Sequence, residues 1–184
     1  MEKEYKKIEE EKEYFNRKHT IKDTFKEIIP YVIIIVAVLI VRTYIMTPIK
    51  VNGTSMMNTL EHGDTMILNK IGMKFNDIKR FQIVVIKDHD SYLIKRIIGL
   101  PGETIEYKEG KLLINNKEVK DPYYKDNNTD DFEKTTICDD CYFVMGDNRS
   151  NSKDSRLIGN IKEKDILGTT KVIIFPISNI GIAE

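Results

Sequence analysis

Ser55 and Lys95 are the two residues of this sequence that could carry out nucleophilic chemistry together. Ser55 lies in V-N-G-T-S-M-M-N-T-L, where Gly53 permits a tight bend that can expose the hydroxyl and leave a backbone N–H free for an oxyanion. Lys95 lies in Y-L-I-K-R-I-I-G, and burial among apolar neighbours can lower a lysine pKa by several units from about 10.4. Strand alternation puts Lys95 and Arg96 on opposite faces, so one can be buried while the other stays in water. Taken singly, each candidate is better explained as part of an ordinary turn or an exposed strand.

A third polar segment, M-G-D-N-R-S-N-S-K-D-S-R at 145–156, is dense in hydrogen-bonding side chains. It directly follows the apolar run 142–144, and on its own it would be interpreted as a surface loop. Its place after an apolar strand makes it a candidate partner for the serine and the lysine.

The three histidines offer poor alternatives as a base. His19 lies in the charged N-terminal segment, and His62 and His89 lie in charged, turn-like stretches. A Ser-His-Asp triad therefore has weak candidates, and no H-E-x-x-H zinc motif is present.

Cys138 and Cys141 form the motif C-D-D-C. Zinc needs four ligands and there is no second cysteine pair, so no metal site is predicted. The pattern fits either a small structural disulfide or two free thiols, and in neither form is it catalytic. No cofactor is expected.

The balance of charges gives no support for nucleic acid as a partner, and an uneven distribution of apolar residues indicates a membrane setting. The 184 residues carry 29 Lys plus Arg and 29 Asp plus Glu, a formal net charge of zero. Residues 1–27 are highly charged, whereas 28–46 are apolar apart from Arg42 and would span about 28 Å as a helix. We predict a charged cytoplasmic segment at 1–27, helical or disordered, a transmembrane signal anchor at 28–46 that ends at Thr47-Pro48, and an extracytoplasmic domain at 47–184.

The remaining sequence predicts a mainly β protein. Short apolar runs separated by turn signals favour an all-β catalytic domain of the sandwich or barrel type. Residues 121–137 are polar and acidic and are predicted to form a surface loop. We expect strands at 49–51, 65–68, 82–86, 92–98, 104–107, 111–114, around Val119, and at 142–145 and 169–175.

In this order the segments resemble the type I signal peptidases over roughly residues 28–176. The matching stretches are the apolar span that leads to Pro48, G-T-S-M-M-N-T-L, G-D-T-M-I-L-N-K, K-R-I-I-G-L-P-G-E and G-D-N-R-S-N-S-K-D-S-R. The resemblance implies a membrane-bound serine endopeptidase that removes signal peptides from exported preproteins, cutting after small-x-small sequences. Exported preproteins and membrane lipid would be its partners.

The resemblance also assigns roles to residues. Ser55 would be the nucleophile, with its backbone N–H in the oxyanion hole, and Lys95 would be the general base. Ser152 would orient the Lys95 amine. A supporting polar network would consist of Asp147, Arg149, Asp154 and Arg156. Pockets for small side chains would be lined by Met56, Leu60, Leu93 and Ile94.

Lysine rather than histidine as the base points to the bacterial branch of the family. Gly53, where some members have a serine, resembles the Gram-positive members. Asn58 stands where the family usually has proline, which would loosen the turn after the nucleophile.

Three other functions compete with this interpretation. A non-catalytic relative, such as a pilus assembly chaperone, would be expected to lack the serine or the lysine. A self-cleaving repressor would need a DNA-binding domain and no membrane span. A membrane-anchored binding domain would leave the matching motifs unexplained.

Overall fold

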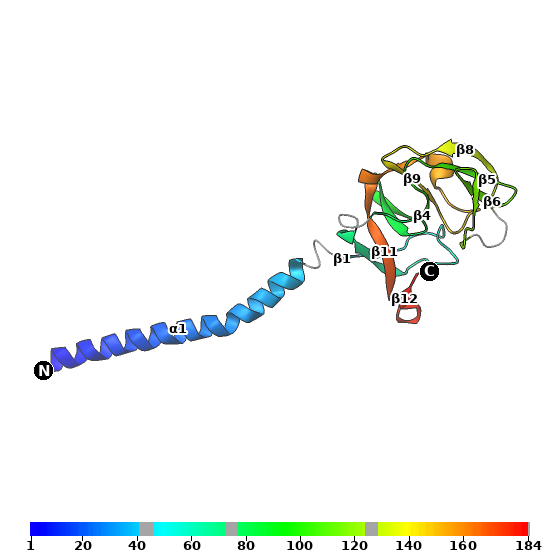
Figure 1. Ribbon diagram of the computed structural model, residues 1–184. Helices are drawn as coiled ribbons and strands as arrows, with labels where there is room; N and C mark the ends of the chain where they lie inside the picture. Colours follow the sequence, from blue (N-terminus) through cyan, green and yellow to red (C-terminus); the bar gives the residue numbers. More distant parts are fainter. Residues whose placement is uncertain (41–45, 73–76, 124–128, 184) are drawn as a thin grey trace. The chain divides into compact units, whose positions relative to one another are not determined.

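The computed structural model describes residues 1–40, 46–72, 77–123 and 129–183 of the chain. The chain divides into two compact units, residues 1–43 and 44–184. Figure 1 shows the first unit as a single helix and the second as a domain of strands.

Helix α1, Glu2–Ile40, makes up the first unit. Its first turns are rich in Glu and Lys, and its end is uncharged and contains Pro30. The prediction of a helical anchor over 28–46 is wrong at its last residue, because Met46 already begins strand β1; residues 41–45 of the predicted anchor lie outside the described residues. Among the described residues, no helix has both the length and the apolar character needed to cross a membrane.

The larger sheet of the second unit holds the segments that carry the candidate residues. Within the described residues its strand order is β1-β2-β11-β3-β4-β9-β10, with β12 paired to β11. Neighbouring strands are antiparallel, so the sheet brings together segments from both ends of the domain. Its strands are β1 Met46–Lys50, β2 Thr65–Asn69, β3 Ile83–Asp88, β4 Ser91–Gly99, β9 Cys141–Met145, β10 Ile161–Lys162, β11 Ile166–Phe175 and β12 Gly181–Ile182.

The smaller sheet has the order β7-β6-β5-β8 among the described residues. Its members are β5 Thr104–Lys108, β6 Lys111–Ile114, β7 Lys117–Val119 and β8 Phe132–Thr136. The two successive hairpins predicted from the Glu-Gly and Asn-Asn turns are present as β5-β6 and β6-β7. The prediction of a loop over 121–137 is wrong in part, because β8 pairs with β5; residues 124–128 lie outside the described residues.

Three short helical turns complete the described elements of the second unit. They are α3 Ser155–Ile158, η2 Glu163–Asp165 and η3 Ile177–Asn179. The mainly β class predicted from the sequence is confirmed.

The core explains why β3 and β4 are continuous apolar runs rather than alternating ones. Ile83 and Val85 of β3 pack in one buried cluster with Met56 and Leu60, whereas Val84 and Ile86 pack in another on the opposite face. Strands covered on both faces must be apolar throughout. A buried lysine or arginine in β4 therefore sits inside protein, whichever face it occupies.

Candidate active site

Ser55 lies in the turn that follows β1. The turn begins at Gly53, whose φ of 99° is a left-handed conformation that suits glycine. The Gly53 N–H donates to His62 Nδ1 at 3.0 Å, and the Met57 N–H donates to the Thr54 carbonyl at 3.1 Å. Asn58 also has a positive φ, 83°, which proline cannot adopt. The turn therefore differs in backbone conformation from one with proline at this position, and is not merely looser.

Lys95 of β4 meets Ser55 directly. Its Nζ donates to Ser55 Oγ at 2.6 Å, although the two residues are 40 positions apart. Lys95 is 2% exposed, and among the described residues it has no ion-pair partner. Burial lowers the pKa of Lys95 below its usual value, and the charges of Asp154 and Asp147 offset part of that effect.

The segment after β9 holds the Ser55 turn from the other side. The Asn148 N–H donates to the Ser55 carbonyl at 3.0 Å, and Asn148 Nδ2 donates to the Thr54 carbonyl at 3.1 Å. Asn151 Nδ2 donates to Thr54 Oγ1 at 3.0 Å. Gly146 permits this approach, because a Cβ there would collide with the Ser55 carbonyl and Ser152 Oγ. The polar segment is therefore a structural support of the nucleophile turn rather than a surface loop.

Asp147 forms a buried ion pair with Arg96. Arg96 Nε donates to Asp147 Oδ1 at 2.8 Å, and one terminal guanidinium nitrogen donates to Oδ2 at 2.7 Å. The guanidinium also donates to the Phe81 carbonyl at 2.7 Å and lies 3.3 Å from the centre of the Tyr123 ring. The expectation that only one of Lys95 and Arg96 would be buried is wrong, because Arg96 is 1% exposed and its charge is paired.

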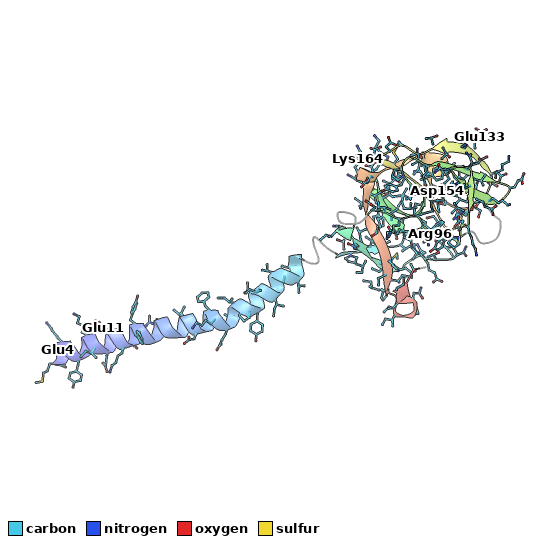
Figure 2. All side chains as sticks on the ribbon, in the orientation of Figure 1. Glu4, Glu11, Arg96, Glu133, Asp154 and Lys164 are labelled. Carbon is cyan, nitrogen blue, oxygen red and sulfur yellow. A yellow bond between two sulfur atoms is a disulfide. The ribbon has the colours of Figure 1, made fainter. Side chains whose placement is uncertain are left out.

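The other predicted network residues take part in two further ion pairs. Arg149 pairs with Asp121 at 2.6 Å and donates to the Gly146 carbonyl at 3.0 Å. Arg156 pairs with Asp154 at 2.8 Å. Burial alone would raise the pKa of Asp154, but hydrogen bonds from Arg156 and from the Gly146 N–H bring it below its usual value. Figure 2 labels Arg96 and Asp154 among the side chains of the strand domain.

Ser152 does not make the predicted hydrogen bond to the Lys95 amine in this structure. Its Oγ is buried and makes no well-aligned hydrogen bond with any described residue, Lys95 included. It lies near enough to the Asp154 carboxylate to help lower the pKa of that group. The Ser152 hydroxyl therefore lies inside the site, beside the Asp154 carboxylate whose charge raises the pKa of Lys95, but it is not bonded to the Lys95 amine.

A small cavity of about 30 Å³ opens at the serine and the lysine. Three of the four predicted pocket residues line it, namely Met56, Leu93 and Ile94. Leu60 does not line it and packs in the adjoining core. The remaining lining residues are Val51, Asn52, Gly53, Ser55, Tyr92 and Lys95. A cavity of this size suits a small side chain.

Two other features lie outside this site. A larger hollow of about 630 Å³ is lined by residues that include Arg80, Thr169 and Lys171, but neither Ser55 nor Lys95 lines it. Cys138 and Cys141 are joined as a disulfide, one of the two alternatives left open by the sequence. With Asp140 they form the one group of possible metal ligands found among the described residues, but sulfurs in a disulfide are not thiolate ligands.

Reasoning from the sequence missed several residues of the site. Arg96 is the ion-pair partner of Asp147, and Asp121 is the partner of Arg149. Asn148 and Asn151 hold the Ser55 turn. The only signal for Arg96 was its place next to Lys95 in an apolar strand. Asp121 could not be distinguished from other acidic residues in a polar stretch.

A β scaffold that places a serine hydroxyl against a buried lysine amine suits a serine hydrolase. Comparison with known proteins agrees with this class. The family model described as signal peptidase, peptidase S26 matches residues 22–175. The chain therefore belongs to the signal peptidase family, peptidase S26.

Individual relatives cover most of the chain. A signal peptidase I of Bacillus amyloliquefaciens is 39% identical over 94% of this chain and 98% of its own length. Signal peptidase I S of Bacillus subtilis is 40% identical over 79% of this chain and 85% of its own. A crystal structure of a signal peptidase I from Enterococcus faecalis matches with a TM-score of 0.47 and 32% identity, over 51% of this chain and 97% of that one.

Proposed function

We propose that this protein removes N-terminal signal peptides from exported preproteins, with Ser55 as the nucleophile and Lys95 as the general base. The observation that carries the mechanism is the 2.6 Å contact between Ser55 Oγ and a buried Lys95 Nζ that has no ion-pair partner among the described residues. A neutral amine at that distance can accept the serine proton over the same contact through which it now donates.

The reaction follows from this contact in two stages. Ser55 Oγ attacks the scissile carbonyl carbon while its proton passes to Lys95 Nζ. Lys95 then gives that proton to the leaving amine, and the acyl group stays on Ser55 as an ester. Lys95 next takes a proton from water, the resulting hydroxide attacks the ester, and the proton returns to Ser55 Oγ.

The Ser55 backbone N–H is our proposed oxyanion donor. Across the part of the chain that the structure describes, no acceptor is found for this N–H. The Gly53 N–H is occupied by His62 Nδ1, and Gly53 has no hydroxyl to add. The Ser55 carbonyl is fixed by the Asn148 N–H, which orients the peptide next to the nucleophile.

The polar network holds the 146–156 segment in place beside the dyad. Asp147, Arg149, Asp154 and Arg156 each take part in an ion pair, and these pairs keep their charges fixed around the 146–156 segment. Ser152 is proposed to orient the Lys95 amine when substrate binds, because its buried hydroxyl has no well-aligned partner among the described residues. Small residues at the first and third positions before the cut would fit the small cavity at the dyad.

We further propose that the apolar end of α1, from Ile28 onward, anchors the protein in the membrane. Residues 1–27 would lie in the cytoplasm and 47–184 outside it, because 8 Lys and Arg lie in residues 1–27 and only Arg42 and Lys50 lie in residues 42–69. The described side chains of this part of the helix are exposed and uncharged, as in Ile33 and Leu39. Release of the chain from membranes by alkaline carbonate would contradict this topology.

The function has a direct test. The full chain in detergent and lipid should cleave a preprotein whose signal ends in Ala-x-Ala, and Ser55→Ala and Lys95→Ala should each abolish cleavage. Matched controls are the exposed residues Ser178 and Lys87, whose alanine variants should cleave at the wild-type rate. A wild-type rate in either dyad variant would refute the mechanism.

A further inference from the structure

One edge of β4 is open beside the catalytic residues. Strand β9 pairs with Arg96–Gly99 of β4, and among the described residues no strand pairs with Ser91–Lys95 on that side. The main chain of Ile97 is bonded toward β3, since its N–H donates to the Gln82 carbonyl at 2.9 Å. Because main-chain groups alternate in direction along a strand, those of Ile94 and Tyr92 point toward the open edge.

A second open edge belongs to β1 and the residues that follow it. Strand β1 is an edge strand that pairs with β2 alone among the described elements. The Val51 N–H and carbonyl are both bonded on the β2 side, to Asp64 and Gly63 at 2.7 and 2.9 Å. By the same alternation Lys50 and Asn52 point the other way. Residues from both edges line the cavity at Ser55, so an extended peptide could lie between them.

Tyr92 closes this groove at one point. Its hydroxyl donates to the Lys50 carbonyl at 2.6 Å and accepts from the Lys50 N–H at 3.1 Å. Both outward main-chain groups of Lys50 are thus occupied by a side chain that crosses from β4. Asn52, one alternation nearer to Ser55, has no main-chain partner among the described residues and is left to bind a peptide.

The hydrogen bonds between Tyr92 and the Lys50 main chain limit the length of the groove. Tyr92 precedes Lys95 by three residues, which is about 10 Å of extended strand. We propose that Tyr92 is a specificity-determining residue, which ends the groove so that only about three substrate residues before the cut pair with the enzyme main chain. The proposal rests on the proposed function and assigns the length of the recognised segment to one side chain.

A backbone scan of the substrate tests this proposal. Peptides with a single N-methyl amide at each of the six positions before the cut would be cleaved by the full chain in detergent and lipid. For the wild type, a methyl group that removes a paired N–H within the first three positions should lower kcat/KM by about threefold to tenfold. At the fifth and sixth positions it should change kcat/KM by less than twofold.

Two variants move the end of the groove. Tyr92→Phe frees the Lys50 main chain, and Tyr92→Ala also removes the ring, so sensitivity to N-methylation should extend to the fourth and fifth positions in both. Tyr142→Phe, at a tyrosine that does not line the cavity, should retain the wild-type pattern. If Tyr92→Ala does not fold, Tyr92→Phe alone decides the matter.

The possible outcomes distinguish a failure of the proposed role of Tyr92 from a failure of the proposed peptidase function. Wild-type sensitivity at the fifth or sixth position, or an identical pattern in wild type and Tyr92→Phe, overturns the role of Tyr92 and leaves the peptidase activity intact. Failure of the wild type to cleave any peptide or preprotein overturns the proposed function and this proposal with it.

Discussion

Strand β4 buries a cation on each of its two faces, but only one of the two cations, Arg96, is paired with a carboxylate. Lys95 is 2% exposed and touches the Ser55 hydroxyl, with no ion-pair partner among the described residues. Arg96 is 1% exposed and is bonded twice to Asp147 and once to the Phe81 carbonyl. Burial without a partner lowers a lysine pKa and produces a base, whereas burial with a carboxylate produces a fixed structural charge.

The choice of residue types matches these two environments. Arginine stays charged and its fork fits a carboxylate, which suits the Arg96 side. Lysine can lose its proton when it is desolvated, which suits the Ser55 side. Asp147 connects the two faces, since it pairs with Arg96 and also opposes the fall in the pKa of Lys95.

The largest effect is expected where the paired cation loses its partner. Asp147→Asn leaves Arg96 buried without a countercharge and should lower the free energy of unfolding by about 3–5 kcal/mol. Denaturant unfolding of the full chain in detergent would measure it. Glu118→Gln is the control, because the Lys111–Glu118 pair is 58% and 60% exposed and such a pair contributes about 0–1 kcal/mol. Equal stability of the two variants would show that the Arg96 side needs no paired charge.

A smaller effect is expected on the Lys95 face, from Ser152. If its hydroxyl orients the amine only in the complex with substrate, Ser152→Ala should lower kcat by about 10–100-fold, at the low end of what positioned proton transfer contributes. KM and the free energy of unfolding should change little, because Ser152 Oγ has no well-aligned bond to lose in the described structure. Ser150→Ala, at an exposed neighbour, is the control. Identical kcat values for the two variants would exclude a role for Ser152.

Some of the structural features behind these predictions could be predicted from the sequence, and others could not. Strands β3 and β4 of the large sheet were predictable because their apolar runs are long, whereas the two-residue strands β10 and β12 were not predicted. Ser55 and Lys95 were chosen as candidates from their motifs. Strand β8 was not, because its pattern of mostly exposed polar residues comes from pairing at a sheet edge rather than from a buried face. An edge strand with so little burial has no period-2 signal to detect.

The two cations of β4 show a second limit. Alternation predicted correctly that Lys95 and Arg96 face opposite ways, but not that both faces are covered. That outcome depends on Asp147, which is 51 residues away in the chain, and on Tyr123 in a stretch predicted to be a loop. The left-handed conformation of Asn58 was likewise hidden, because asparagine is compatible with several backbone conformations.

The smallest effect concerns the cost of leaving Lys95 unpaired. Lys95→Met removes a buried amine that prefers to be neutral and should raise the free energy of unfolding by about 0.5–2 kcal/mol while abolishing cleavage. Thermal or denaturant unfolding of the full chain in detergent would measure the gain. Lys87→Met, at an exposed position of the neighbouring strand, is the control and should change stability by less than about 0.5 kcal/mol.

The pH dependence of that gain separates a charge effect from better packing. Because the pKa of Lys95 is lower in the folded protein than in the unfolded chain, the unfolded chain binds more protons between the two values. Wild-type stability therefore rises with pH from the folded pKa up to the unfolded value of about 10.4. The advantage of Lys95→Met should be largest below this window and shrink as the pH rises through it. An advantage independent of pH would mean that methionine packs better, and that the lysine is not held at the expense of stability.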